Sequence, residues 1–415
     1  MGLILSENNV VDFLKHKNIC PPNFYPLVPI ICKESKNFNL VVRTSQDDSP
    51  NSFNHTSSDR TSFLVKQNRV DREGKTSGHL ITEWLVQELI NKFSNLATIQ
   101  PLISEVVLFD RDNSILVSVF YDDYIALDSY YRTCQSYHPQ IARTIGMNLA
   151  QVHCATYQHQ QIREFLSQYF KLDRPIRPPG FIRELNTVTP DIFGKVCPDG
   201  LDFYKLYQRF PSLQQAIVEL YDNIQSTCVT HNDLTLDNFI IDTNLNLDLS
   251  DESVQIKPEQ VKIIDWELIY WADPAVDLGM LISQYLGEWL NTLVADPNLD
   301  LHTTLSLATC PLEKIVPSLR ALLQGYLATF PEIIEYRPDY LRRIVQFAGI
   351  GLINRLSYYV EYHHPFDNEA LCKLQVAKNL LCSPKEAINT IFGTTEAELI
   401  DGSTAKADHN LQTMV

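Results

Sequence analysis

The spacing of apolar residues changes near Asp122, and this change limits the class of fold. Before Asp122, short runs of β-branched and aromatic residues alternate with polar turns, a pattern typical of strands. A short amphipathic helix around Val10 and Leu14 precedes these runs. We expect strands over residues 25–32, 38–43, 62–67, 105–109 and 114–121, with a helix over 81–93 between the third and fourth.

Beyond Asp122 the apolar spacing becomes mostly helical. We expect helices over residues 141–157, 212–226, 276–294 and 341–361. Two strand-like runs interrupt them, at 239–241 and 260–264, and the Asp- and Asn-rich stretch between these runs predicts a long hairpin loop. From Thr394 onward apolar periodicity is absent, which is typical of a flexible tail. The sequence therefore predicts an α+β chain with domains 1–121 and 122–393 and a tail 394–415.

The net charge of the 415-residue chain argues against two classes of partner. Nucleic acids and anionic membranes both require basic surface, whereas this chain carries a net charge of -16. No apolar run reaches the length of a membrane helix, and the nine cysteines form no CxxC pair. We therefore expect a cytoplasmic protein without nucleic-acid or membrane partners. The acidic charge would suit a cationic small substrate, and the sequence carries no signal for oligomeric state.

The segment 230–241 carries the strongest chemical signal. It contains His231, Asp233 and Asn238 in the order H-x-D-x₄-N, the spacing of a kinase catalytic loop. Phosphoryl transfer needs a carboxylate beside the attacking hydroxyl group and a metal ligand nearby. This spacing predicts Asp233 as the catalytic base and Asn238 as a metal ligand, with His231 supporting the loop.

A second acidic residue ends the apolar run 261–264. This residue is Asp265, and the predicted hairpin would fold it back toward Asn238 so that both side chains meet one Mg²⁺ ion. Magnesium prefers hard oxygen ligands, so a carboxylate and an amide oxygen suit it when nucleotide phosphates complete the set. Trp266 and Glu267 stand where protein kinases carry Phe-Gly.

Together with the run DPAVDLG from Asp273 to Gly279, these motifs resemble the signature of the aminoglycoside phosphotransferase and choline kinase superfamily. The resemblance implies a bilobal protein-kinase-like fold, in which a small N-lobe with an antiparallel sheet and one helix precedes a larger, mostly helical C-lobe. It implies ATP and Mg²⁺ as cofactors and transfer of the γ-phosphoryl group to a hydroxyl group of a small molecule. It also implies that Asp273 and Asp277 are mainly structural and tie down the loop after the metal-binding strand.

The same resemblance implies a lysine on the α- and β-phosphates and a helix glutamate that holds it. Lys66, at the end of the third predicted strand, is the candidate lysine. Glu83 and Glu88 both lie on the following helix, and we prefer Glu83 because the family spacing is short. The turn between the first two strands, at 34–37, lacks glycine, so it adds no evidence for nucleotide binding.

Two alternatives stay open at this point. A protein kinase is disfavoured because Asn232 and Thr235 replace the Arg and Lys of its catalytic loop, and no A-P-E segment follows Asp265. A pseudokinase or nucleotide-binding interaction module is the other alternative. The identity of the substrate has no signal, because the expected substrate insertion, at 165–210, contains no recognisable motif. His153, on an apolar helix, is interpreted as a packing residue.

Overall fold

The computed structural model describes residues 3–20, 25–26, 30–31, 37–45, 62–69, 80–172, 182, 185, 189–245, 255–294, 296, 298–299, 303, 307–362 and 364–401. By their contacts these residues form two units. The first comprises Met1–Leu127, Asn238–Asn246 and Glu259–Ile269, and the second comprises Asp128–Asp237, Leu247–Pro258 and Tyr270–Val415. The sequence predicted two domains that are each continuous and meet between residues 121 and 122. In the structure, two later segments belong to the same unit as the N-terminal residues.

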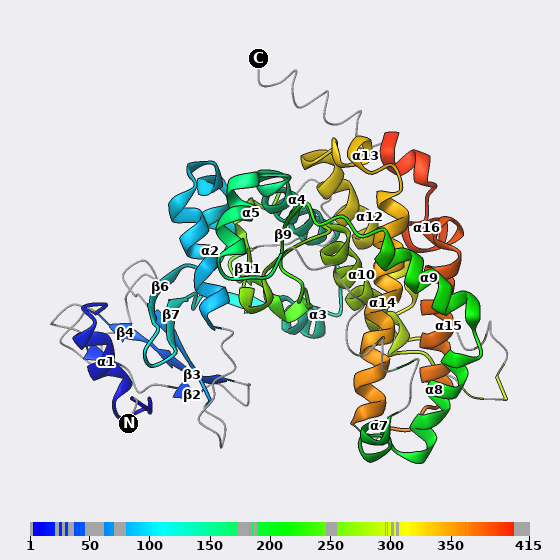
Figure 1. The fold of residues 1–415 in the computed structure, drawn as a ribbon, viewed down its shortest axis with the longest axis horizontal. Helices are drawn as coiled ribbons and strands as arrows, with labels where there is room; N and C mark the ends of the chain where they lie inside the picture. Colours follow the sequence, from blue (N-terminus) through cyan, green and yellow to red (C-terminus); the bar gives the residue numbers. More distant parts are fainter. Residues whose placement is uncertain are drawn as a thin grey trace. The chain divides into compact units, whose positions relative to one another are not determined.

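An antiparallel sheet dominates the first unit, with strand order β2-β3-β5-β7-β6. Its strands are β2 (Ile30–Ile31), β3 (Asn37–Val42), β5 (Ser62–Asn68), β7 (Ile115–Phe120) and β6 (Val106–Asp110). Helices α1 (Val10–His16) and α2 (Leu80–Lys92) cover opposite faces (Figure 1). Val117 packs in the cluster that contains α1, and its neighbour Leu116 packs against Leu80 of α2. This alternation follows from the strand period of two.

A second, smaller sheet of the first unit joins distant parts of the sequence. It contains β8 (Tyr124–Ala126), β10 (Phe239–Asp242) and β11 (Val261–Ile263) in the order β11-β10-β8. Strands β10 and β11 form the hairpin that the sequence predicts, with Phe239 opposite Ile263. Pairing of β10 with β8 explains why the segments around β10 and β11 belong to the first unit.

Short elements complete the first unit. Strand β1 (Tyr25–Pro26) pairs with β4 (Thr44–Ser45), so β1 and β2, the described parts of the expected strand over 25–32, belong to different sheets; 27–29 and 32 lie outside the described residues. The described residues of this unit also form the 3₁₀ helices η2 (Ser94–Leu102), η5 (Pro258–Gln260), which begins one residue before the unit, and η6 (Trp266–Leu268). The glycine-free turn lies outside the described residues except for its last position, Asn37.

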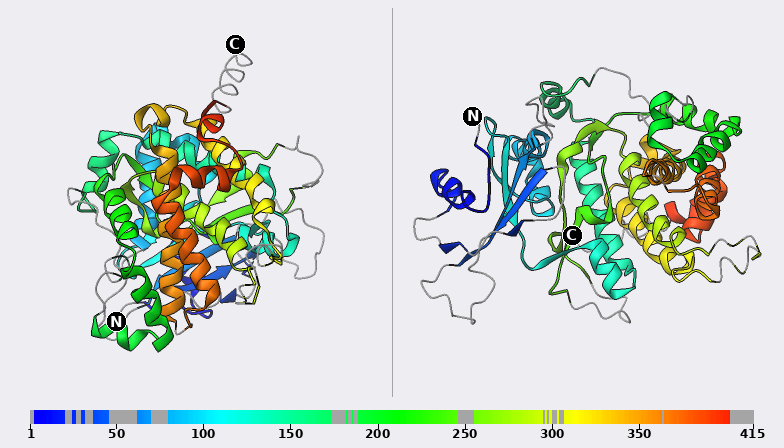
Figure 2. Two further views of the ribbon diagram at one scale, coloured as in Figure 1. Left: turned by 90° about the vertical axis from the view of Figure 1, so that its right-hand side faces the viewer. Right: turned by 90° about the horizontal axis from the view of Figure 1, so that it is seen from below.

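Long helices form most of the second unit. The helix α4 (Pro139–Thr156) packs against α12 (Leu312–Thr329), and α14 (Tyr340–Glu361) packs against both α10 (Ala275–Leu290) and α15 (Asn368–Cys382). Figures 1 and 2 show α14 and α15 side by side. The shorter elements are α3 (Leu127–Cys134), α5 (Gln160–Ser167), α7 (Pro190–Lys195), η3 (Pro198–Gly200), α8 (Leu201–Gln208), α9 (Pro211–Asp222), β9 (Cys228–Thr230), η4 (Leu236–Asn238), β12 (Tyr270–Ala272), α13 (Ile333–Tyr336) and α16 (Pro384–Phe392).

Glycines allow two of these helix pairs to approach closely. A Cβ atom on Gly146 of α4 would collide with the backbone carbonyl of Leu322 on α12. A Cβ atom on Gly279, the last residue of the DPAVDLG run, would collide with the side chain of Phe347 on α14. The glycine of that run therefore has a packing function, because it brings the backbone of α10 against α14.

The expected flexible tail differs from the structure. Residues 396–401 are helical, Leu399 is buried, and Glu396 forms an ion pair with Arg342 at 3.0 Å. The burial of Leu399 and the ion pair of Glu396 hold this segment in place, although its sequence lacks apolar periodicity. The remainder of the expected tail, 402–415, lies outside the described residues. Within the described part of the chain, no helix is both long and apolar enough to span a membrane.

Candidate active site

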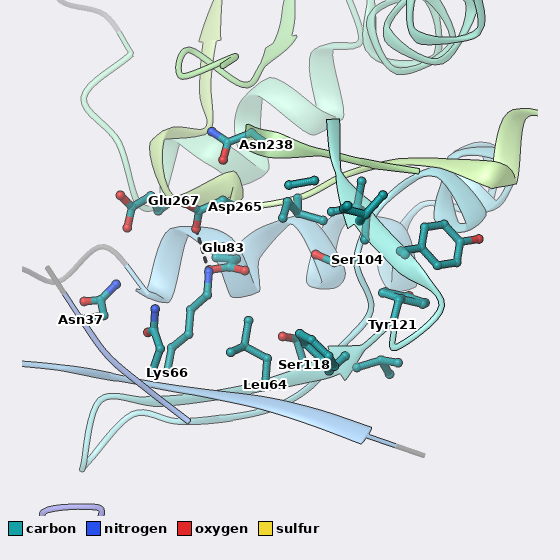
Figure 3. Close-up of a pocket in the computed structure, with 18 residues that line it drawn as sticks. Asn37, Leu64, Lys66, Glu83, Ser104, Ser118, Tyr121, Asn238, Asp265 and Glu267 are labelled. Carbon is teal, nitrogen blue, oxygen red and sulfur yellow. Dashed lines mark hydrogen bonds and ion pairs between the residues drawn. The ribbon is translucent and has the colours of Figure 1, made fainter. Parts of the chain in front are cut away.

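A cavity of about 600 Å³ lies within the first unit (Figure 3). One part of its lining comes from strands β3, β5 and β7, and another comes from the segment 121–126, from β10 and from the residues that follow β11. Four of the five residues predicted for the site line this cavity: Lys66, Glu83, Asn238 and Asp265. The fifth, Asp233, belongs to the second unit and is described there.

Lys66 connects two carboxylates in this cavity. Its Nζ lies 2.8 Å from Oε2 of Glu83 and 2.7 Å from Oδ1 of Asp265. The side chains of Lys66 and Glu83 are 9% and 3% exposed, whereas that of Asp265 is 35% exposed. Burial alone would lower the pKa of Lys66, but the two carboxylates outweigh it and hold that pKa above its ordinary value. The ammonium group therefore stays charged.

Helix α2 determines which glutamate reaches Lys66. Leu80, Glu83 and Gln87 are spaced by three and four residues and are buried, so they lie on one face of the helix. Of the two glutamates left open by the sequence, Glu83 is the one bonded to Lys66. The preceding residue, Thr82, donates its hydroxyl hydrogen to the backbone carbonyl of Glu267. Thr82 thus holds the segment that carries Asp265 directly, and Glu83 holds the lysine that bonds to Asp265.

Asp265 lies in a sharp turn after β11. Its φ of 64° and ψ of 53° are left-handed, a conformation that aspartate tolerates better than most residues. The next side chain, Trp266, is buried, and its Nε1 donates to the carbonyl of Ile263 at 3.1 Å. This anchored indole fixes the turn, so the carboxylate of Asp265 reaches Lys66 from a defined backbone.

Asn238 and Asp265 are brought together by the β10–β11 hairpin. The backbone N–H of Ile264 donates to the carbonyl of Asn238 at 2.9 Å, which places the two predicted metal ligands on adjoining strand ends. In Figure 3, Asp265 lies between Asn238 and Lys66. The amide oxygen of Asn238 and the carboxylate oxygens of Asp265 are ligands that suit Mg²⁺. Among the described residues no group of three or more His, Cys, Asp or Glu side chains could hold a metal ion. Mg²⁺ usually keeps several waters, so Asn238 and Asp265 would bind it together with water or phosphate oxygens.

The loop that carries Asp233 is held by Asp277 in the second unit. Asp277 Oδ2 accepts a hydrogen bond from the backbone N–H of His231 at 2.7 Å, and Oδ1 accepts one from that of Asn232 at 2.8 Å. Asn232 is left-handed, with a φ of 64°. Asp277 therefore fixes the backbone immediately before Asp233, whereas the resemblance implied that it ties down the loop after the metal-binding strand.

A buried network supports Asp277 in turn. His153 Nε2 lies 3.2 Å from Oδ2 of Asp277, and its Nδ1 lies 3.0 Å from the hydroxyl of Tyr326, which also bonds to Tyr340. Burial would raise the pKa of Asp277, but hydrogen bonds and charge from His153 and His231 hold it below its ordinary value. His153 is fully buried and hydrogen-bonded, as interpreted from the sequence.

Asp273 fixes the start of α10. Its Oδ2 accepts a hydrogen bond from Nη2 of Arg343 at 2.7 Å, and both side chains are buried. Its Oδ1 accepts a bond from the N–H of Ala275 at 3.0 Å, which satisfies a free donor at the helix N-terminus. Of the two acids in the DPAVDLG run, Asp273 therefore holds the start of α10 and Asp277 holds the loop before Asp233.

Several other residues of the cavity were not predicted from the sequence. They are mainly polar and aromatic: Ser104, Ser118, Tyr121, Tyr124 and Glu267. The sequence offered two signals for them: the aromatic and acidic run 120–124 at the change from strand to helix spacing, and the position of Glu267 two residues after Asp265.

A family model described as the phosphotransferase enzyme family matches residues 96–303, half of the chain. The structure is similar to that of an ethanolamine kinase from Plasmodium vivax, with a TM-score of 0.50 and 15% identity over 94% of this chain and 92% of that one. A choline/ethanolamine kinase family protein from Mesorhizobium loti gives a TM-score of 0.43 and 14% identity over 92% and 99%. The first of these likenesses confirms the predicted α+β, protein-kinase-like fold. None of the curated proteins matches the chain.

Proposed function

The chain belongs to the phosphotransferase enzyme family, and on this basis we propose that it transfers the γ-phosphoryl group of ATP to a hydroxyl group of a small molecule, with Asp233 as catalytic base. One observation supports the proposal above all. A buried, charged Lys66 is held by Glu83 and Asp265 in a cavity that Asn238 also lines. This combination provides a cation for phosphate oxygens and two oxygen ligands for a metal ion.

Each residue has a distinct role in this proposal. Lys66 binds the α- and β-phosphates through its ammonium group, and Glu83 keeps that group in position. Asn238 and Asp265 would hold Mg²⁺, which when bound neutralises charge on the phosphate oxygens.

Asp233 would accept the proton of the substrate hydroxyl group. Its backbone is preorganised because Asp277 bonds to the two residues before it. A cytoplasmic location and a cationic acceptor stay predictions from the sequence.

A phosphorylation assay over a panel of small alcohols tests the proposal. ADP release and phosphorylated product are measured with Mg-ATP for the wild type, for Asp233→Asn, and for Asp222→Asn as a matched control at an exposed position. We expect Asp233→Asn to lower turnover by at least about a hundredfold, the usual contribution of a general base, with Mg-ATP affinity retained. Asp222→Asn should behave like the wild type. Full turnover by Asp233→Asn would exclude its role as base.

A further inference from the structure

A second cavity, of about 260 Å³, lies within the second unit. It is lined by residues at the C-terminal end of α10, by the second half of α14 and by α15, three helices that pack together (Figure 1). No part of the proposed phosphotransfer mechanism uses this cavity.

Two cationic side chains, Arg355 and Lys373, line this cavity together. Both have close neighbours that are neutral: Nη1 of Arg355 donates to Oε1 of Gln284, and Nζ of Lys373 lies 5.7 Å from the ring centre of Tyr359. Within the described ranges, neither cation forms an ion pair with a carboxylate. The acidic side chains that act on them do so at longer range: Glu288 and Asp237 on Arg355, and Glu369 and Asp367 on Lys373.

Burial makes the two positive charges costly. It lowers the pKa of both Arg355 and Lys373, because each group loses water without gaining a direct counter-ion. An anion entering the cavity would supply that counter-ion through charge-assisted hydrogen bonds. The arrangement therefore favours an anionic ligand.

Gly287 of α10 makes room for the guanidinium group of Arg355. A Cβ atom at Gly287 would lie 3.1 Å from Cζ and 3.2 Å from Nη2 of Arg355, closer than ordinary contact. Glycine inside a helix lowers the stability of that helix. In α10 the close approach of Arg355 compensates for this loss. The guanidinium group thus lies directly against the helix beside the cavity.

The remaining lining is largely apolar and includes Leu290, Leu352 and Leu356 together with Tyr359. We propose that this cavity binds a small organic anion, whose carboxylate or phosphate group is held by Arg355 and Lys373 and whose apolar part contacts the leucines. The chain has a net charge of -16, so this cavity is a positively charged region of an otherwise acidic protein. Such an anion differs in charge from the cationic acceptor that the sequence predicts.

Calorimetric titration of the full chain with phenyl phosphate, benzoate and inorganic phosphate tests this inference. We expect phenyl phosphate or benzoate to bind the wild type more tightly than inorganic phosphate, since only the first two carry an apolar group. Arg355→Gln should weaken this binding by about tenfold or more, because it removes a charge-assisted bidentate donor. Lys373→Gln, on a partly exposed helix face, should weaken it in the same direction without affecting folding.

Two further variants separate this cavity from other cationic sites. Gly287→Ala keeps both charges but displaces the guanidinium group of Arg355, so it should also weaken binding. Lys385→Gln removes an exposed charge on α16 and should bind phenyl phosphate as the wild type does. Absence of binding to the wild type, or equal affinity in the wild type and Arg355→Gln, would overturn the inference.

Discussion

The Nζ of Lys66 lies 2.7 Å from Oδ1 of Asp265, although 199 residues separate them in the sequence. The same nitrogen lies 2.8 Å from Glu83, so a single cation joins strand β5, helix α2 and the turn after β11. Because Asp265 is the more exposed of the two acids, it is the partner that a metal ion would reach from the cavity.

The choice of Glu83 rather than Glu88 leads to a matched pair of variants. Glu83→Gln removes the buried charge that holds Lys66, and we expect the affinity for Mg-ATP to fall by about tenfold, the loss of one charged hydrogen bond. Glu88→Gln makes the same chemical change on the same helix and should leave the affinity unchanged. Fluorescence or calorimetric titration distinguishes them, and a larger loss in Glu88→Gln would reverse the assignment.

Asp277 is expected to stabilise the fold as well as the loop. Its two oxygens accept separate hydrogen bonds from His231 and Asn232, whereas asparagine offers one acceptor oxygen. Asp277→Asn therefore leaves a buried backbone donor unpaired, and we expect a loss of about 1–3 kcal/mol in the free energy of unfolding at pH 7. Urea unfolding measures it, and an unchanged midpoint and slope would contradict the network.

The pH dependence of that loss has a defined sign. The fold lowers the pKa of Asp277 below its ordinary 3.8, so the carboxylate's contribution is complete above pH 3.8 and is lost as the pH falls through the folded-state value. The difference in unfolding free energy between the wild type and Asp277→Asn should therefore be constant near neutrality and shrink only in acid. A difference that shrank as pH rose from 5 to 7 would mean that another group is responsible.

The close contact of α4 with α12 predicts a steric effect. Gly146→Ala places a methyl group against the backbone carbonyl of Leu322, and we expect destabilisation of about 1–3 kcal/mol, as for other overpacked helix contacts. Gly194→Ala on α7 is the control, because a Cβ atom there meets nothing within 4 Å. Denaturant unfolding of both variants gives the comparison, and equal stability would place the helices further apart than described.

The periodic elements of the fold could be predicted from the sequence, whereas very short strands could not. The predicted strand over 62–67 corresponds to β5, and the predicted helix over 81–93 corresponds to α2. By contrast β8, β9 and β12 have three residues each and exist because they pair with distant segments. Helix α12 escaped prediction because Pro317 lies inside it and reads as a helix end.

For the site, motif spacing indicated Asn238 and Asp265, since a hairpin between two apolar strands brings its ends together. The partners of these motifs needed the tertiary structure. The rotation of α2 about its axis turns Glu83 toward Lys66. The packing of α10 places Asp277 against the backbone of His231 and Asn232. The cavity of Arg355 and Lys373 has no sequence signal, because its two cations lie on different helices.

Titration of ATP into the wild type and the Asp265→Asn variant, with Mg²⁺ and again with EDTA, examines the proposed role of the Lys66 cavity. If Asp265 holds the metal ion, the variant should bind ATP at least about tenfold more weakly than the wild type with Mg²⁺, and the difference should be much smaller with EDTA. Equal affinities with Mg²⁺, or no binding of Mg-ATP by the wild type, would contradict a nucleotide and metal site in this cavity.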